Sequence, residues 1–202
     1  MPNTFQNSRE NIAASQSREL TNVFLRGVYL WMTIGLGVTA LAAWMVMSSY
    51  TLLYTLYTTP VLLYGLLIGE LVLVFALVKA LPKLSGTAAT AMFIVYSAVS
   101  GVTLAPVLTL YTEASIAATF FTCAGMFGAM SAYGLLTKRD LSGMGSFMTM
   151  GLIGLIIAMV VNIFLNSSAL GFAVSIIGVI IFTGLTAYDT QKLRAMGENA
   201  PM

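Results

Sequence analysis

Long segments without a charged side chain dominate the pattern of polar and apolar positions along the chain. Residues 27–69, 84–112, 114–137 and 141–188 contain no Asp, Glu, Lys or Arg. A helix needs about 20 apolar residues to cross a bilayer, so each segment is long enough for at least one crossing. Divided at polar and turn residues, the pattern predicts six spans at about 25–47, 60–81, 88–111, 115–136, 145–165 and 170–189.

These spans are predicted to be helices rather than strands of a membrane barrel. A barrel strand alternates apolar and polar side chains over about ten residues, whereas Leu71–Val78 is apolar on both faces. Residues 166–168 (Asn-Ser-Ser) bond readily to nearby backbone, which predicts a short turn between the last two spans. The predicted fold class is therefore an all-α integral membrane protein, a bundle of six transmembrane helices.

The basic residues all fall on one side of this six-span topology. They lie before span one, between spans two and three, between spans four and five, and after span six: Arg9, Arg18, Arg26, Lys79, Lys83, Lys138, Arg139, Lys192 and Arg194. Loops rich in Lys and Arg stay in the cytoplasm, so the N-terminus and residue 202 are both predicted to be cytoplasmic. The predicted organisation is a polar, flexible tail at 1–22, a six-helix domain at 23–190 and a basic segment at 191–202.

Composition removes several classes of function. Charged residues make up 8% of the chain, against roughly 25% in soluble domains, so the lipid bilayer is the expected partner. The lack of histidine removes the commonest general base and metal ligand. The net charge is +2 without a basic, aromatic patch, so nucleic acid is not expected. We expect no enzyme activity, no cofactor and no stable metal site, and we expect the single Cys123 to be a packing residue.

Two acidic residues and an interrupted span are the candidates for chemistry inside the membrane. Glu70 lies near the middle of span two, where a carboxyl costs on the order of 2–3 kcal/mol unless it is satisfied, so it should face protein or water. It fits an ion or proton pathway and a protonated structural hydrogen bonder equally well. Asp189 closes span six, and the alternative to a function there is a weak surface pair with Lys192. Thr103 and Pro106 interrupt span three, where a freed carbonyl marks a simple kink or lines a pathway.

Small residues at four-residue spacing predict close contacts between helices. They are Ser97 and Gly101 on span three, and Ala124, Gly128 and Ala132 on span four. Small side chains let helix backbones approach closely in lipid. Packing within the bundle and contact with another protein both fit this pattern. Asn162 in span five is predicted to form a hydrogen bond between helices.

Four short motifs, taken in their order along the chain, resemble the bacterial branch of the Bax inhibitor family. They are residues 100–106 (SGVTLAP), 131–134 (SAYG), 137–142 (TKRDLS) and 184–192 (GLTAYDTQK). With the order of spans, the resemblance covers nearly the whole chain from about residue 20. It implies a multi-pass protein of the bacterial inner membrane.

The resemblance also implies a pH-sensitive calcium leak through a bundle of six helices around a central seventh. Asp189 matches the aspartate at the end of helix six that pairs with an aspartate on helix seven and latches the cytoplasmic mouth, so it is the implied pH-sensing and gating residue. Glu70 matches an acidic position on helix two and, with Thr103, forms the expected ion pathway. Lys79 and Lys83 lie where a basic partner of the latch is expected. Calcium would be the transported ion, bound transiently at Asp189 and Glu70.

The chain ends at Met202, thirteen residues after Asp189, and so lacks the implied seventh span and partner aspartate. We therefore expect a truncated form of a longer protein, in which a shell of helices without its central member exposes a groove. The leading hypothesis is a calcium leak channel, favoured by Glu70. The alternative is a non-conducting regulatory protein that binds a membrane protease or another membrane complex, favoured by the small-residue positions.

Overall fold

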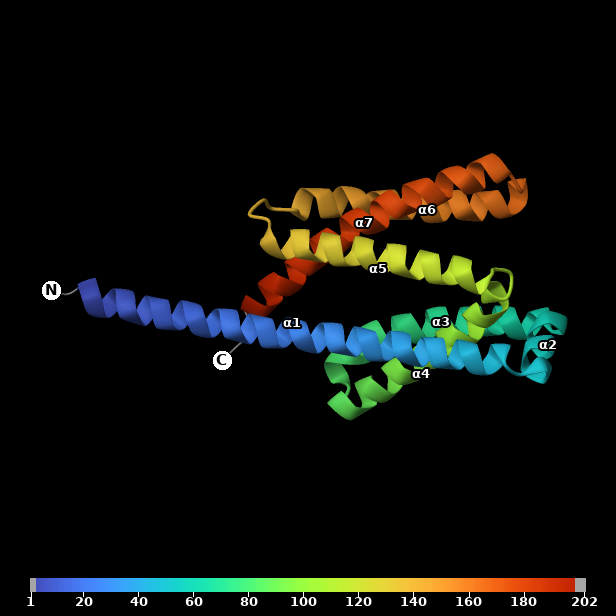
Figure 1. Cartoon of the computed structure of the whole chain (residues 1–202), viewed down its shortest axis with the longest axis horizontal. Coiled ribbons are helices and arrows are strands. Elements are labelled where there is room, and N and C mark those ends of the chain that lie inside the picture. The colour runs from blue at the N-terminus through green and yellow to red at the C-terminus, as the bar shows by residue number, and fades with distance from the viewer. Residues whose placement is uncertain (1–2, 199–202) are drawn as a thin grey trace. The chain divides into compact units, whose positions relative to one another are not determined.

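The computed structural model describes residues 3–198, with the side chains of residues 3–18 and of residue 81 left aside. Within these residues the chain is helical with short connections. The elements in chain order are α1 (Asn3–Met47), α2 (Tyr50–Thr58), α3 (Pro60–Ala80), the 3₁₀ turn η1 (Leu81–Lys83), α4 (Gly86–Leu108), α5 (Glu113–Leu136), α6 (Ser142–Leu165) and α7 (Ser168–Glu198) (Figure 1).

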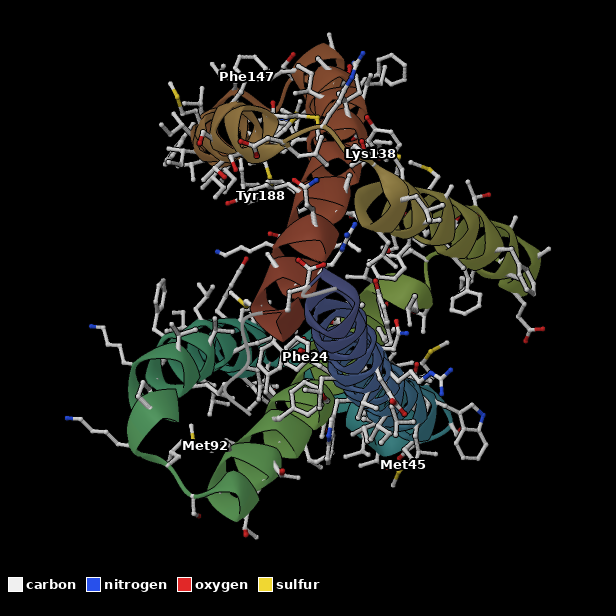
Figure 2. The ribbon with its side chains drawn as sticks, turned by 90° about the vertical axis from the view of Figure 1, so that its left-hand side faces the viewer. Phe24, Met45, Met92, Lys138, Phe147 and Tyr188 are labelled. Atoms are coloured by element: carbon white, nitrogen blue, oxygen red, sulfur yellow. The ribbon has the colours of Figure 1, made fainter. Side chains whose placement is uncertain are left out.

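Six of the described helices are long and apolar enough to cross a membrane. They are α1 from Glu19 onward, α3, α4, α5, α6 and α7. Large apolar side chains cover their outer faces; Phe147 on α6, labelled in Figure 2, is 70% exposed. Apolar surface on this scale is suited to lipid rather than to water. The predicted class, an all-α integral membrane protein with six spans, is confirmed.

The chain forms two compact units. One consists of Met1–Arg26 and Thr119–Met202, and the other of Gly27–Ala118. We call them the α5–α7 unit and the α1–α4 unit after their main helices. The boundaries fall inside α1 and near the start of α5.

Small residues let α1 and α4 approach closely inside the α1–α4 unit. A Cβ on Gly101 would overlap the Thr39 carbonyl oxygen and would lie 3.0 Å from the backbone nitrogen of Ala43. Beside it, the Thr39 hydroxyl donates to the Ser97 carbonyl at 2.9 Å. Gly101 and Ser97 are both buried. The predicted packing role of this pair is confirmed.

Helix α2 was not predicted, and the structure shows why it forms. Ser49 caps its first turn by accepting from the Leu52 N–H at 3.4 Å. At its other end the Tyr57 hydroxyl donates to the Pro106 carbonyl at 2.8 Å. Leu56 from α2 joins a buried cluster with Ala43, Val46 and Ala105. Helix α4 stays helical through Pro106 to Leu108.

Helices α6 and α7 form an antiparallel hairpin in the α5–α7 unit (Figure 1). The turn begins at Asn166, which adopts a left-handed conformation with φ of 47°. The Asn162 side chain accepts from the Ser167 N–H at 3.0 Å. The predicted turn at residues 166–168 is confirmed, whereas the predicted interhelical role of Asn162 is wrong, because its side-chain oxygen caps this turn.

Helix α5 meets α7 near the end of the α5–α7 unit that carries the loop to α6. A Cβ on Gly134 would overlap the Ala187 carbonyl oxygen. About two turns further along α7, Arg194 donates to the Leu135 carbonyl at 2.7 Å. These contacts position the last turns of α7 against the end of α5.

Both predicted terminal segments are helical where the structure describes them. Residues 3–22 belong to α1, so the expectation of a flexible tail is wrong for their backbone. Within the α5–α7 unit, Thr21 and Leu25 are buried, and a Cβ on Gly197 would lie 3.1 Å from the Thr21 Cα. Span six likewise continues past residue 189 to Glu198. Residues 199–202 of the predicted basic segment lie outside the described residues.

The orientation of the spans stays a prediction that labelling can check. With Cys123 replaced by serine, we expect Glu113→Cys to react with an impermeant thiol reagent in intact cells. We expect Lys138→Cys to react only after the cells are opened, because basic loops remain cytoplasmic. Measurement of labelled protein by mass shift tests both positions, and the reverse pattern would contradict the topology.

Candidate functional site: a carboxyl inside the membrane span

Glu70 lies at the middle of α3, with ten residues of the helix before it and ten after. The helix is otherwise apolar except for Lys79 in its last turn. Its carboxyl is half-buried and faces α4. The prediction that Glu70 faces protein rather than lipid is confirmed.

Two hydroxyls from α4 hold the Glu70 carboxyl. Ser100 donates to Oε1 in a short hydrogen bond, and Thr103 donates to Oε2 at 3.1 Å. Ser100 and Thr103 are three residues apart and therefore lie on the same face of α4. Thr103 is 7% exposed, so this end of the cluster is closed to lipid. We call these three residues the Glu70 cluster.

The hydroxyls of the Glu70 cluster can serve either protonation state of the carboxyl. The Thr103 hydroxyl also lies 3.2 Å from the Val99 carbonyl and 3.0 Å from the Ser100 carbonyl of its own helix. An ionised Glu70 accepts from both hydroxyls. A protonated Glu70 can donate to Thr103, whose own hydrogen then goes to a carbonyl of α4. Either form of the carboxyl can therefore be hydrogen-bonded in the same position.

Asp189 is exposed on α7, in the α5–α7 unit. In the described part of the chain, no hydrogen bond or ion pair joins its carboxylate to another residue. The weak pair with Lys192 that the sequence offered as an alternative is not formed. The structure thus leaves this carboxylate open, and its implied role as a latch stays a prediction.

Lys79 lies in the last turn of α3 and Lys83 ends the turn η1, and both are exposed. They belong to the α1–α4 unit, whereas Asp189 belongs to the other unit. Their implied role as the latch cation stays a prediction.

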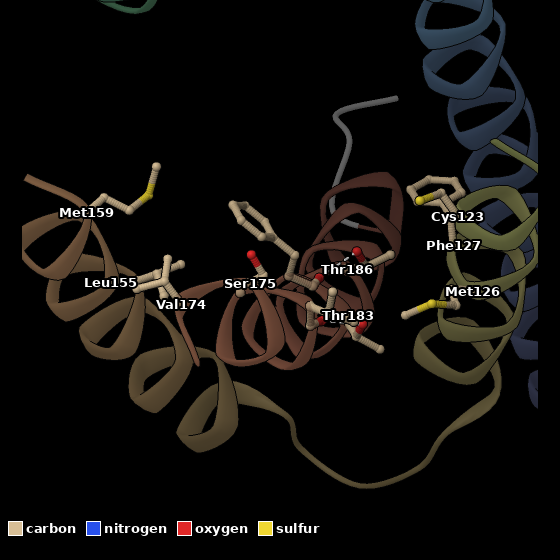
Figure 3. A pocket seen from close by; sticks show the side chains of 12 residues that line it. Cys123, Met126, Phe127, Leu155, Met159, Val174, Ser175, Thr183 and Thr186 are labelled. Atoms are coloured by element: carbon tan, nitrogen blue, oxygen red, sulfur yellow. Dashed lines mark hydrogen bonds between the residues drawn. The ribbon is translucent and has the colours of Figure 1, made fainter. Parts of the chain in front are cut away.

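An apolar groove of about 580 Å³ lies among α5, α6 and α7 (Figure 3). Figure 3 shows Cys123 and Met126 from α5 on one side, Leu155 from α6 on the other, and Thr183 of α7 between them. Cys123 is exposed at this groove, and its expected role in packing rather than chemistry stays a prediction. The sequence predicted an exposed groove in a shell of helices without its central member. The groove in Figure 3 lies within the α5–α7 unit.

Among the described residues, no three or more Cys, Asp or Glu side chains gather where they could hold a metal ion. Glu70 is instead a single carboxylate accompanied by two hydroxyls.

The fold and the Glu70 cluster define a class of protein. It is a helical membrane protein with a hydrogen-bonded carboxyl in the middle of one span. Within that class, residues 21–202 match the sequence profile of the family described as inhibitor of apoptosis-promoting Bax1. The chain belongs to this Bax inhibitor family, which confirms the resemblance.

Curated relatives cover most of the chain. It is 51% identical to the inner membrane protein YbhL of Escherichia coli (strain K12), over 91% of this chain and 78% of that protein. It is 44% identical to an uncharacterised protein of Borreliella burgdorferi, over 88% of this chain and 76% of that protein. It is 40% identical to an uncharacterised protein of Deinococcus radiodurans, over 93% of this chain and 80% of that protein. No solved structure matches the chain.

Sequence reasoning placed Glu70 and Thr103 in the site but missed Ser100. The signal was present, since Ser100 lies one helical turn before Thr103 and shares its face. Gln191 and Tyr57 were also missed, although both join separate elements through side-chain hydrogen bonds. Their partners lie about 50 positions away in the chain, and no local sequence pattern predicts such pairs.

Proposed function

We propose that this protein is a pH-sensitive calcium leak channel of the bacterial inner membrane. The observation that carries the proposal is the Glu70 carboxyl, held at mid-span by Ser100 and Thr103. Carboxylates inside membrane spans are costly and commonly mark ion or proton paths. Carboxylate and hydroxyl oxygens are also the ligands that calcium prefers. The function needs no chemical step and no cofactor.

In this proposal Asp189 supplies the pH response. Its open carboxylate on α7, the sixth span, would share a proton with an aspartate on a further span. The family resemblance implies that further span and its aspartate. Two carboxylates in contact do not both ionise readily, so the shared proton holds the mouth closed. Loss of that proton would produce repulsion and open the path. The family resemblance implies a basic partner for this latch, and Lys79 and Lys83 are the candidates for it.

Calcium flux into liposomes tests the proposal. Purified protein should admit calcium to vesicles loaded with a fluorescent indicator, faster than empty vesicles do and with a rate that changes with pH. Vesicles that stay as tight as protein-free controls at every pH would contradict conduction. Folding of the reconstituted protein is checked in the same samples by circular dichroism.

Asp189→Asn tests the gate separately from the path. In protein that carries the implied partner helix, the variant should keep conducting but lose the pH dependence between about pH 6 and 8, the range expected for a carboxyl pair that shares a proton. Glu198→Gln, which alters another acid of α7, is the matched control and should keep the wild-type profile. A wild-type profile in Asp189→Asn would show that Asp189 is an ordinary acid on the helix surface.

A non-conducting regulatory protein is the second candidate, and one observation favours it. On α5 a Cβ at Gly125 or Gly128 would meet nothing within 4 Å, and Ala132 is exposed. Small residues that contact no helix of their own unit, among the described residues, leave room for a helix of a membrane protease or another membrane complex. Absence of calcium flux, together with crosslinking from Gly128→Cys to another membrane protein, would favour this candidate.

A further inference from the structure

A hollow of about 390 Å³, lined mostly by charged and polar residues, lies where the loop between α5 and α6 meets α7. Lys138 and Arg139 of the loop and Lys192 of α7 are among the residues that line it. The loop joins a candidate span that ends at Leu136 to one that begins at Ser142. The hollow therefore lies at an end of two spans, where a membrane protein meets the lipid headgroups. We call it the loop hollow.

Among the described side chains, none forms an ion pair with the three cations of the loop hollow. All three side chains are exposed. Across the part of the chain whose side chains are described, the single ion pair joins Arg194 to Glu198 at 2.9 Å. The positive charges at the loop hollow are therefore available to a ligand.

One carboxylate also lines the loop hollow. Asp140 accepts from the Ser142 N–H at 2.9 Å. Hydrogen bonds from the Ser142 side chain and backbone lower the pKa of Asp140, so it stays ionised at neutral pH. Three cations against one carboxylate leave the loop hollow positively charged, and that remaining charge suits an anion.

The walls of the loop hollow are held in place before any ligand binds. Gln191 of α7 accepts from the Leu141 N–H at 2.9 Å and donates to the Arg139 carbonyl at 2.8 Å. This side chain therefore ties the loop to α7 at two points. Gly145 of α6 leaves space for the ring of Tyr188, which a Cβ would overlap. A site that is already ordered loses less conformational freedom on binding.

We propose that the loop hollow binds the phosphate group of an anionic phospholipid. Lysine and arginine are the side chains that bind phosphate best, and basic pockets between membrane helices accept lipid headgroups. A lipid is favoured over a soluble phosphate because large apolar side chains flank the loop: Leu136 is 79% exposed and Phe147 is 70% exposed. They offer contact to the acyl chains of the same molecule. The proposal is independent of calcium conduction.

Lipid binding to the detergent-purified protein tests the proposal by native mass spectrometry. Phosphatidylglycerol should reach the same bound fraction as phosphatidylcholine at about a tenth of the lipid concentration, or less. Lys138→Gln, Arg139→Gln and Lys192→Gln should each weaken phosphatidylglycerol about fivefold, the effect expected of one basic residue near a membrane surface. Each of these variants keeps eight of the nine basic residues, so insertion should be preserved.

Two controls separate a built site from general surface charge. Lys79→Gln combined with Lys83→Gln removes two exposed cations from the end of α3 and the turn η1, and it should leave phosphatidylglycerol affinity unchanged. Gln191→Ala alters no charge but frees the loop from α7, and it should weaken binding severalfold. Equal loss in the Lys79 and Lys83 variant would overturn the proposal, as would equal affinity for the two lipids. Full displacement of the lipid by inorganic phosphate would assign the hollow to a soluble anion instead.

Discussion

Glu70→Gln should lower calcium flux into liposomes at least about tenfold at every pH. The amide keeps the size of the carboxyl and can still bond to Ser100 and Thr103, so the helix pair α3 and α4 should remain folded. It removes the negative charge that would meet the ion, and an interaction with a charged group contributes about 1.5–3 kcal/mol, where 1.4 kcal/mol corresponds to a factor of ten. Initial rates from an internal calcium indicator measure the effect.

The matched control is Glu113→Gln, which removes an exposed acid from the first turn of α5. Its flux should equal that of the wild type. Thr103→Val preserves shape but deletes one of the two hydroxyls, and an intermediate loss is expected. Unchanged flux in Glu70→Gln would show that the carboxyl is a structural hydrogen bonder between helices, the alternative that its position in the sequence left open.

Gly101→Val should destabilise the α1–α4 unit by about 3 kcal/mol or more. The first added carbon would overlap the Thr39 carbonyl oxygen and would lie 2.8 Å from the Ala42 Cβ. Backbone atoms cannot move aside without separating α1 from α4, and overpacking in a tight contact typically costs about 1–3 kcal/mol even where side chains can shift. Unfolding of the detergent-solubilised protein by denaturant titration measures the loss.

Gly65→Ala is the control for this substitution. Gly65 lies on α3 in the same unit, and a Cβ there would meet nothing within 4 Å. Because alanine is favoured over glycine inside a helix by about 1 kcal/mol, this variant should be as stable as the wild type or more stable. Comparable destabilisation by both substitutions would mean that the contact of Gly101 with α1 is not what stabilises the unit.

The candidate site was only partly predictable from the sequence. The cost of a carboxyl at mid-span required Glu70 to find polar partners, and Thr103 was a candidate because it lies, with Pro106, in the segment predicted to interrupt span three. The sequence could not say that α4 would pack on α3 in the register that brings both Ser100 and Thr103 to this carboxyl. Asp189 was a candidate by its place at the end of a span, and its part in the proposed gate rests on the family resemblance.

Glycines with the same local pattern have different roles in the structure. Gly101 and Gly128 each occur in a small-residue spacing of four on a long apolar helix. Gly101 contacts α1 closely, whereas a Cβ on Gly128 would meet nothing. Spacing determines which residues share a helix face, but it contains no information on which neighbour covers that face.

The sequence by itself determined the class of this protein, its six spans and its family. The length of the apolar runs decides the class and the spans, because backbone polar groups in lipid must be satisfied within each helix. The family was indicated by the four short motifs in their order along the chain. Only the tertiary structure decided how polar side chains meet: Glu70 with Ser100, Tyr57 with Pro106, and Gln191 with the loop that carries Arg139. Such pairs depend on the register and rotation of packed helices, which arise from the sum of many small contacts between distant segments.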